Sequence, residues 1–183
     1  MKPTMPNLLP VSALASGASS LSRRLLLKFL SAGAAMTAAT GCSAKSASEA
    51  RAKAIFPIRH TEAEWRKLLT RDQFYILREE GTERPGSSPL LAEHRAGTFV
   101  CAADDNPLFT SKTKFESGTG WPSFWQPIKG SVGTTRDTSF GVVRTEVHCA
   151  QCGGHLGHVF DDGPPPTGLR YCMNGDALKF RPA

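Results

Sequence analysis

The sequence lacks any long hydrophobic run, and this and other scarcities exclude several classes of protein. No apolar segment approaches the roughly 20 residues that a helix needs to span a bilayer. Glycine and proline, at 17 and 13 of 183 residues, make up less than a fifth of the chain, which excludes a wholly disordered or collagen-like protein. A length of 183 residues with 40% hydrophobic side chains suits one globular domain with a buried core and an additional segment.

An excess of positive charge is also missing from most of the chain. The formal net charge is +6, but residues 1–50 contain five of the 22 basic residues and one of the 16 acidic residues. The rest of the chain therefore holds 17 basic and 15 acidic side chains. Composition gives no indication of a nucleic-acid partner, because the basic character belongs to the N-terminal segment.

The N-terminal segment has the layout of an export signal. Residues 22–28, Ser-Arg-Arg-Leu-Leu-Leu-Lys, precede a weakly apolar stretch of small residues over 29–40, as in secretory signals. The paired arginines and the low hydrophobicity resemble a twin-arginine signal, a bacterial address that carries folded proteins. We therefore expect an exported protein of the bacterial periplasm. A surface helix flanked by basic residues is the alternative.

Two cleavage sites are open for this signal. Ala39-Thr40-Gly41-Cys42 resembles a lipobox, in which Cys42 would carry a lipid anchor and tether the protein to the membrane. Cleavage among the small residues 44–47 is the alternative, and residues 45–54 form a polar tether in either case. We assign residues 1–50 to the signal and tether, and residues 61–183 to the folded domain.

Two short helices are predicted at the start of the folded part. Thr61-Glu62-Ala63-Glu64 is a capping box, and Thr70-Arg71-Asp72-Gln73 repeats the signal. The second helix is expected to end at Gly81. Each helix is expected to present apolar side chains to the core, Trp65, Leu68 and Leu69 from the first and Phe74, Tyr75 and Leu77 from the second.

From Gly97 onward the helical period is absent, and short runs of β-forming residues alternate with turns. These runs cover residues 98–100, 132–135, 141–147 and 171–173. Loops at 118–120, 153–154 and 162–166 are expected at the surface between strands. The pattern predicts a β-rich α+β fold, in which the N-terminal helices pack on an antiparallel β body.

Cysteine is scarce in the folded part, and four residues at paired spacings could hold a metal ion. Cys149 and Cys152 form a C-x-x-C pair, which can bind one metal ion or close a disulfide. Cys101 and Asp104 have the same spacing, with an aspartate oxygen in place of a thiolate, so the four residues could bind zinc. A metal-free cluster and a structural disulfide are the alternatives.

Cys172 is separate from both pairs and follows Arg170 closely. A thiol beside a guanidinium and within reach of imidazoles can be held as the reactive thiolate. His155 and His158, three residues apart, could supply the imidazoles, as proton donors or as metal ligands. Cys172 is thus a candidate nucleophile, and a buried inert cysteine is the alternative.

Six segments in one order resemble the type B methionine sulfoxide reductases, which reduce the R epimer of methionine sulfoxide. The segments are residues 81–85, 113–118, 120–124, 144–147, 155–163 and 168–174, so the resemblance covers about residues 61–183. It implies two antiparallel β-sheets with short N-terminal helices. It also implies a monomeric repair enzyme that acts on oxidised proteins or peptides, uses a thioredoxin-like or other thiol reductant, and needs no organic cofactor.

The same resemblance assigns roles residue by residue. Cys172 is expected to be the nucleophile that becomes a sulfenic acid. Trp121 and Phe160 are expected to form the apolar wall for the substrate methyl group. Positioned imidazoles protonate the departing oxygen and contribute about 10²–10⁴-fold. The residues expected around the sulfoxide are His155, His158 and Asn174, with Asp162 and Arg170 as their supports.

Two positions depart from the pattern of this family. Thr119 stands where many members carry a resolving cysteine, so the disulfide from that loop to Cys172 cannot form. Asp104 stands where a metal-ligating cysteine is usual. Either an external thiol reduces the sulfenic acid, or one of the other cysteines replaces the missing thiol. We expect Cys101 to do so only if the metal is absent.

Two other functions compete with this hypothesis. One is an exported, non-catalytic metal-binding or interaction module, which would tolerate Cys172→Ser and fail without Cys149 or Cys152. The other is a general disulfide oxidoreductase that uses Cys149 and Cys152, against which the lack of a βαβ pattern around the pair argues.

Overall fold

The computed structural model describes residues 55–183 of the chain. The expected twin-arginine signal, the lipobox at Cys42 and the tether over residues 45–54 all lie outside the described residues. Within residues 55–183, no helix has both the length and the apolar character needed to cross a bilayer.

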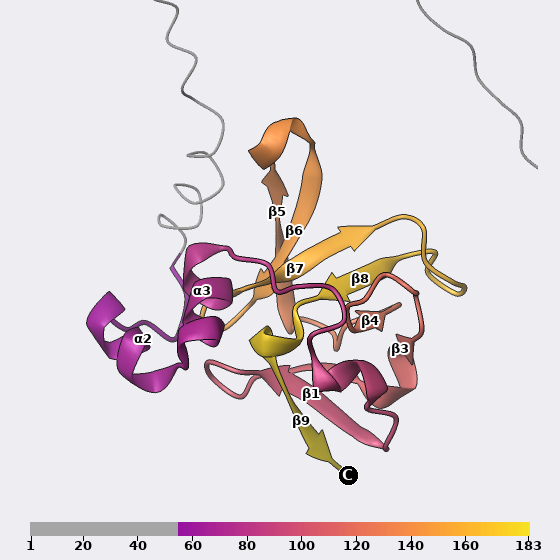
Figure 1. The fold of residues 1–183 in the computed structure, drawn as a ribbon, viewed down its shortest axis with the longest axis horizontal. Helices are drawn as coiled ribbons and strands as arrows, with labels where there is room; N and C mark the ends of the chain where they lie inside the picture. The colour runs from indigo at the N-terminus through magenta and orange to yellow at the C-terminus, as the bar shows by residue number, and fades with distance from the viewer. Residues whose placement is uncertain (1–54) are drawn as a thin grey trace, which may run out of the picture. The chain divides into compact units, whose positions relative to one another are not determined.

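Both predicted helices are present, α2 at Glu62–Leu68 and α3 at Arg71–Glu79 (Figure 1). Each begins with the predicted capping box. The N-cap threonine hydroxyl, from Thr61 or Thr70, accepts the backbone N–H three residues on, and the side chain at that third position accepts the N–H of the threonine. These contacts are local, so the sequence places the helix starts correctly.

The inward faces of the helices differ from the prediction in three side chains. Leu68 and Tyr75 are exposed, whereas Ile76 is buried. The seven-residue helix α2 reaches the core through Trp65, and Leu69 is buried from the position after the helix. A helix of two turns presents only a narrow face to the core, and Leu68 lies outside that face.

The second helix ends earlier than predicted. Its last residue is Glu79, and Glu80 takes the left-handed conformation at φ 59°. Gly81 follows this cap, and a Cβ atom there would lie 2.3 Å from the Tyr75 ring. The glycine therefore makes room for the Tyr75 ring, while the left-handed conformation falls on Glu80.

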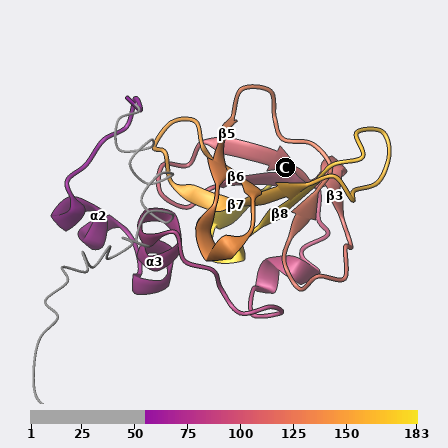
Figure 2. The same cartoon turned by 90° about the horizontal axis from the view of Figure 1, so that it is seen from above.

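Within residues 55–183, nine strands form two antiparallel sheets, as the resemblance implied (Figure 1 and Figure 2). The three-stranded sheet has the order β2-β1-β9, with β2 at Pro107–Thr110, β1 at Gly97–Cys101 and β9 at Leu178–Pro182. The six-stranded sheet has the order β3-β4-β8-β7-β6-β5, with bounds Lys114–Phe115, Ser123–Phe124, Arg170–Met173, His155–Phe160, Arg144–Cys149 and Val132–Asp137. Of the strands in the two sheets, the sequence pattern did not indicate five: β2, β3, β4, β7 and β9.

In the described part of the chain, these elements are connected by four 3₁₀ turns, η1 at Pro89–Ala92, η2 at Ser111–Thr113, η3 at Ser139–Gly141 and η4 at Gly175–Ala177. Because η3 occupies the tip between β5 and β6, β6 begins at Arg144, three residues later than the predicted run at 141–147.

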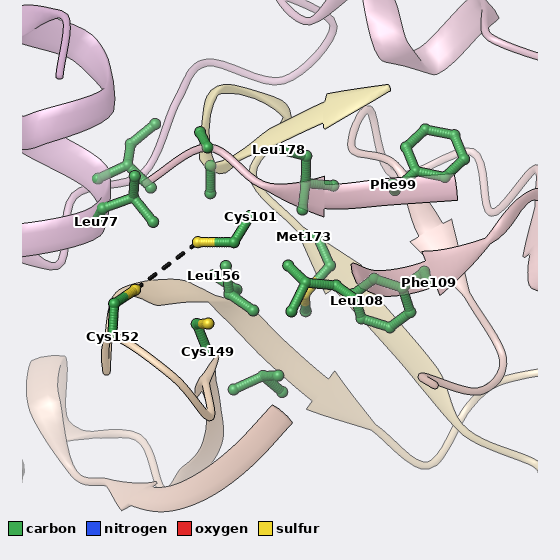
Figure 3. Close-up of a cluster of buried hydrophobic side chains, with 14 of the residues drawn as sticks. Leu77, Phe99, Cys101, Leu108, Phe109, Cys149, Cys152, Leu156, Met173 and Leu178 are labelled. Carbon is green, nitrogen blue, oxygen red and sulfur yellow. Dashed lines mark hydrogen bonds between the residues drawn. The ribbon is translucent and has the colours of Figure 1, made fainter. Parts of the chain in front are cut away.

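The core fills the space between the two sheets and is made largely of aromatic and aliphatic side chains. Phe109 of β2 stacks on Phe124 of β4 with ring centroids 4.3 Å apart, and Phe99 of β1 lies 4.9 Å from Phe124. Leu156 and Met173 are fully buried beside them (Figure 3). Burial of each such side chain contributes about 1.5–3 kcal/mol, so this packing holds the sheets together.

One predicted surface loop is buried. Gly153 and Gly154 do connect two strands, β6 and β7, but both are buried. A Cβ at Gly153 would lie 2.4 Å from the Phe56 ring, and one at Gly154 would lie 2.9 Å from Leu77. Phe56, which precedes α2, and Leu77 of α3 therefore cover this turn, and the glycines leave room for both side chains.

Candidate active site

A small cavity lies beside β7 and β8. Its volume is about 120 Å³, and it is lined by Thr82, Trp121, Arg144, Gly157, His158, Phe160, Cys172 and Asn174. Pockets for whole small molecules usually measure about 300–1,000 Å³, so this one suits the end of a single side chain. It unites five of the eight residues expected for catalysis and substrate binding: Cys172, His158, Asn174, Trp121 and Phe160.

A larger hollow of about 280 Å³ beside α2 and α3 lacks this chemistry. It is lined by His60, Glu62, Trp65, Phe74, Arg78 and Glu79. Its carboxylates are paired, because Arg66 lies 2.8 Å from Glu62 and 3.1 Å from Glu79. Size alone therefore does not identify the site, whereas the presence of a thiol does.

Strand pairing brings the thiol and an imidazole together. Cys172 of β8 is opposite His158 of β7 on one side and Ser123 of β4 on the other. Residues directly opposite in antiparallel strands point to the same face. The half-buried Cys172 and His158 therefore face the cavity side by side.

The approach of β7 to β8 requires Gly157. A Cβ at this position would lie 2.1 Å from the carbonyl oxygen of Cys172 and 3.0 Å from Met173 Cα. Both atoms belong to the backbone, so they cannot move aside without displacing β8. The glycine in the His-x-Gly-His segment therefore sets the distance between the imidazole strand and the thiol strand.

His158 is held by an ionised carboxylate. Its Nε2 lies 2.8 Å from Asp137 Oδ2, which also accepts a hydrogen bond of 2.7 Å from Arg144. Burial alone would raise the pKa of Asp137, but hydrogen bonds from Ser139 and His158 and the charge of Arg144 lower it well below its usual range. An ionised Asp137 only accepts, so Nε2 carries the proton and Nδ1 is the basic nitrogen of the neutral ring.

The electrostatic surroundings also keep His158 neutral. Burial lowers the pKa of His158 below its ordinary value, and the neighbouring positive charge of Arg144 acts in the same direction. The hydrogen bond to Asp137 opposes this shift without reversing it. At neutral pH the ring is therefore able to accept a proton from a neighbouring thiol.

His155 lies behind His158 and does not line the cavity. Its side chain is 3% exposed, its Nδ1 lies 2.8 Å from Glu146 Oε1, and its ring centroid is 5.4 Å from that of His158. Glu146 is buried as well. His155 is thus placed to support the position of His158, at one remove from the space that a substrate would occupy.

Asn174 closes the cavity at the end of β8 and is fixed by both ends of its amide. Its Oδ1 accepts the N–H of Glu83 at 3.0 Å, and its Nδ2 donates to the carbonyl of Leu156 at 3.1 Å. The Glu83 carboxylate in turn accepts the N–H groups of Gly175 and Asp176 at 2.7 and 2.9 Å. Burial raises the pKa of Glu83, which these two hydrogen bonds oppose.

Two aromatic side chains give the cavity its apolar walls. Trp121 follows Gly120, whose φ is +91° and whose Cβ would lie 2.8 Å from Pro85, so the chain turns tightly just before the indole. Phe160 lies 6.5 Å from the His158 ring. These walls provide the apolar area that a methyl group needs.

Arg170 and Asp162 form an ion pair at the side of the site. Arg170 Nε and Nη2 each lie 2.8 Å from an oxygen of Asp162, and its guanidinium lies 4.4 Å from the centre of the Phe160 ring. The hydrogen bond to Asp162 raises the pKa of Arg170, burial opposes it, and Cys172 adds a smaller rise. A permanent positive charge therefore acts on the thiol, although neither member of the pair lines the cavity.

The expected metal-binding residues form a second cluster, within which Cys101, Asp104, Cys149 and Cys152 place all four ligand atoms within 4.8 Å of one another. Cys101 Sγ lies 3.8 Å from Cys152 Sγ (Figure 3), and Cys149 Sγ lies 3.3 Å from Asp104 Oδ2. Tetrahedral zinc with Zn–S bonds of 2.3 Å holds its sulfur ligands about 3.8 Å apart. The donor set and its spacing therefore fit zinc.

The cluster connects the two sheets and is distant from Cys172. One pair begins at the last residue of β1 in the first sheet, and the other begins at the last residue of β6 in the second. Hydrogen bonds with Cys101 and Cys152 lower the pKa of Cys149, whereas those with Cys149 and Cys152, and burial, raise the pKa of Cys101. From the strand register, Cys149 lies two strands across and three residues along from Cys172, about 14 Å away.

Three acidic residues of the site were not predicted. Glu83 and Glu146 lie in segments 81–85 and 144–147, which carry the resemblance, but the sequence does not reveal their hydrogen-bond partners. Asp137 has no local signal at all. It reaches His158 because β5 and β7 flank β6, and that arrangement exists only in the folded sheet.

Comparison with protein families places this arrangement among known proteins. The SelR domain matches residues 69–182, a span that includes the cavity and the four-residue cluster.

Individual relatives are similar over most of their length. A peptide methionine sulfoxide reductase MsrB of Agrobacterium fabrum is 56% identical over 126 residues, which cover 68% of this chain and 93% of that protein. One of Pseudomonas putida is 58% identical over 123 residues, 67% of this chain and 92% of that protein. One of Bradyrhizobium diazoefficiens is 57% identical over 123 residues, 67% of this chain and 88% of that protein.

Proposed function

Because the chain belongs to the SelR-domain family, we propose that it is a peptide methionine sulfoxide reductase that returns the R epimer of methionine sulfoxide in oxidised proteins to methionine. One observation carries the proposal: Cys172 shares a cavity of side-chain size with His158 and two aromatic walls. A nucleophile, a base and an apolar recess are the parts that this reaction needs.

The chemistry follows from the protonation state of the site. The Cys172 proton passes to Nδ1 of His158, and the thiolate attacks the sulfoxide sulfur. The same proton then neutralises the departing oxygen. The attack forms a bond between the two sulfur atoms. The protonated oxygen then transfers from the substrate sulfur to Cys172 as the substrate S–O bond and this S–S bond break, so methionine is released and the cysteine becomes a sulfenic acid. The substrate sulfur gains two electrons, and the cysteine sulfur loses two.

Selection of one epimer follows from the fixed directions around the sulfur. The methyl group lies against the Trp121 and Phe160 walls, the oxygen points to His158 and the peptide chain leaves through the cavity mouth. With the attack coming from Cys172, only one configuration at sulfur meets all these conditions. His155, Asn174, Asp162 and Arg170 hold these groups in place.

An assay with the separated R and S epimers of a sulfoxide-containing peptide tests the function. We expect turnover of the R epimer alone and loss of turnover in Cys172→Ser, with the melting temperature and metal content unchanged. Equal turnover of both epimers, or an active Cys172→Ser variant, would refute the proposal. Wild-type protein that turns over neither epimer, together with metal binding that Cys172→Ser leaves unchanged, would favour a binding module.

We also propose that Cys101, Asp104, Cys149 and Cys152 bind a structural zinc ion. The support is the close fit of their spacing to a tetrahedral site and their position between the two sheets. When bound, zinc supplies a cross-link that stabilises the fold. Metal analysis of the purified protein tests this, and a protein free of metal after purification with added zinc would refute it.

The sulfenic acid is, we propose, reduced by an external thiol, from a thioredoxin-like protein or another reductant. A disulfide needs Cα atoms about 4.4–6.8 Å apart, and the register separates Cys172 from Cys149 by about twice that distance. This argues against Cys101, which adjoins Cys149, as the resolving residue. Mass spectrometry of the substrate-oxidised enzyme should find no internal disulfide at Cys172. Detection of one would refute the assignment.

The export signal leads to a proposal about location. We propose that the enzyme repairs proteins in the bacterial periplasm, either released or tethered through a lipid on Cys42. Replacement of Arg23 and Arg24 by lysine should leave the protein in the cytoplasmic fraction, and globomycin treatment should alter its processing only if Cys42 is lipidated. Export that does not depend on the arginine pair would contradict this route.

A further inference from the structure

A line of three hydroxyl groups ends at the thiol of Cys172. Thr119 Oγ1 lies 3.7 Å from Cys172 Sγ and 2.8 Å from Ser117 Oγ. Ser117 Oγ lies 2.7 Å from Ser123 Oγ, which is 3.2 Å from the carbonyl oxygen of Trp121. The line thus runs from the reacting sulfur to the backbone of the residue that forms the cavity wall.

The hydroxyls of this line must donate in a common direction, because each hydroxyl has a single proton. If Ser123 donates to the Trp121 carbonyl, then Ser117 donates to Ser123 and Thr119 donates to Ser117. Thr119 is left as an acceptor, which suits a Cys172 thiol. If every hydroxyl turns, Ser123 donates to Ser117, Ser117 to Thr119, and Thr119 to the sulfur, which suits a thiolate.

Burial makes this line more than a surface contact. Ser123 is 1% exposed, and Ser117 and Thr119 are half-buried. Water therefore has limited access to replace a missing hydroxyl, and hydrogen bonds in such surroundings polarise one another. Ser123 is also the strand partner of Cys172, so the sheet fixes both ends of the line.

We propose that Thr119 is a catalytic residue that donates a hydrogen bond to the Cys172 thiolate, and that Ser117 and Ser123 are positioning residues whose hydroxyls reverse direction when the thiol ionises. The proposal rests on the proposed function for the identity of the nucleophile. It gives a role to Thr119, which occupies the position where many members of the family carry a second cysteine. When Cys172 is a neutral thiol, the hydrogen bond that Ser123 donates to the Trp121 carbonyl keeps all three hydroxyls donating away from the sulfur.

The two ends of the line have opposite effects in this scheme. Thr119→Val keeps the branched shape and removes the donor, so the thiolate loses its hydrogen bond. Ser123→Ala removes the group that anchors the thiol arrangement, so the line turns toward the sulfur more easily. If the hydroxyls had a purely structural role, both variants would shift the pH midpoint of Cys172 alkylation in the same direction.

The pH profile of Cys172 alkylation by iodoacetamide measures this without substrate. In Thr119→Val we expect the alkylation rate at pH 7 to fall about tenfold and the pH midpoint to rise. Thr119→Ser should restore both. In Ser123→Ala the midpoint should fall. Thr113→Val is the matched control, because its half-buried hydroxyl donates to the Thr110 carbonyl at 3.1 Å and should leave the profile unchanged.

The outcomes separate this proposal from the proposed function. An unchanged profile in Thr119→Val, or an upward shift in Ser123→Ala, would overturn the reversible line whatever the enzyme reduces. If Thr119→Val does not fold, a shifted profile in Thr119→Ser overturns it equally. If wild-type protein reduces no sulfoxide while the alkylation profiles follow expectation, the function fails and the hydroxyl line stands. We expect kcat/KM for the R epimer to fall with the alkylation rate in Thr119→Val.

Discussion

Replacement of Asp137 by asparagine isolates the protonation state of His158 from its position. The carboxylate is in contact with three donors, since Oδ2 accepts from His158 and Arg144 and Oδ1 accepts the N–H of Ser139 at 2.8 Å. An amide of the same shape has one oxygen and one NH₂ group. Whichever way the amide is oriented, its NH₂ group faces another donor, either His158 Nε2 with Arg144 or the N–H of Ser139.

The magnitude follows from these contacts. A buried donor left without its acceptor costs about 1–3 kcal/mol. If the NH₂ group faces His158, Nε2 must accept and the proton moves to Nδ1, so the base for Cys172 is lost. We expect kcat/KM for the R-sulfoxide peptide to fall about 10²-fold, the lower range for a positioned base.

The pH dependence of kcat/KM distinguishes the loss of the basic nitrogen from a change in the charge of His158. The hydrogen bond that His158 donates to Asp137 raises the pKa of His158, while burial and the charge of Arg144 lower it. Removing the carboxylate therefore leaves His158 neutral at pH 7, and raising the pH should not recover activity. Asp161→Asn removes an exposed carboxylate beside Phe160 and is the matched control. An Asp137→Asn enzyme within twofold of wild type, or one rescued between pH 7 and 8, would refute the reasoning.

The lowered pKa of His158 also sets the sign of its effect on stability. Protonation is harder in the folded than in the unfolded chain, so the group favours folding above its ordinary value of 6.5. This contribution is lost as the pH falls below 6.5. Urea unfolding of wild type and His158→Gln between pH 5 and 7.5 should show a smaller slope with pH in the variant.

The other predictions concern the cluster, the support of the cavity and the strand contact. Cys149→Ser should lose zinc and about 3–4 kcal/mol of unfolding free energy at free zinc 100–1,000-fold above the dissociation constant; equal stability with and without chelator would contradict the site. Glu83→Gln should lower the unfolding free energy by about 1–3 kcal/mol and reduce kcat/KM, because an NH₂ group would face a backbone N–H. Gly157→Ala should cost about 3 kcal/mol by moving β8 away, and a variant with normal stability and alkylation of Cys172 would show that the close approach is not required.

Local signals account for the parts of the fold that the sequence predicts well. The capping boxes at Thr61 and Thr70 depend on contacts three residues apart, and both helices begin where they indicate. The predicted runs correspond to β1, β5, β6 and β8. Strand β7 was missed because its polar histidines and Gly157 do not resemble a strand, and its conformation is stabilised by pairing with β6 and β8.

The residues of the candidate site were likewise predicted only in part. The family resemblance predicted Cys172, His158, Trp121, Phe160 and Asn174 as site residues, and the cavity is lined by all five. Their hydrogen-bond partners could not be read from the motifs, since Asp137 is 21 residues from His158 and Glu83 is 91 residues from Asn174. In the sequence, Thr119 indicated only that a resolving cysteine is absent, whereas in the structure its hydroxyl lies 3.7 Å from Cys172 Sγ.

The amino-acid sequence by itself determined the helix starts and the β-rich class, because each depends on residue type or on short-range spacing, and its resemblance to a known family supplied the prediction of Cys172 as the nucleophile with aromatic and imidazole neighbours. Tertiary structure alone decided which carboxylate sets the tautomer of His158, that His155 stands behind it, that the four-residue cluster bridges two sheets far from Cys172, and that three hydroxyls meet the thiol. The physical reason is strand register: one sheet places β4, β8, β7, β6 and β5 side by side, and pairing across strands brings together side chains that no local pattern connects.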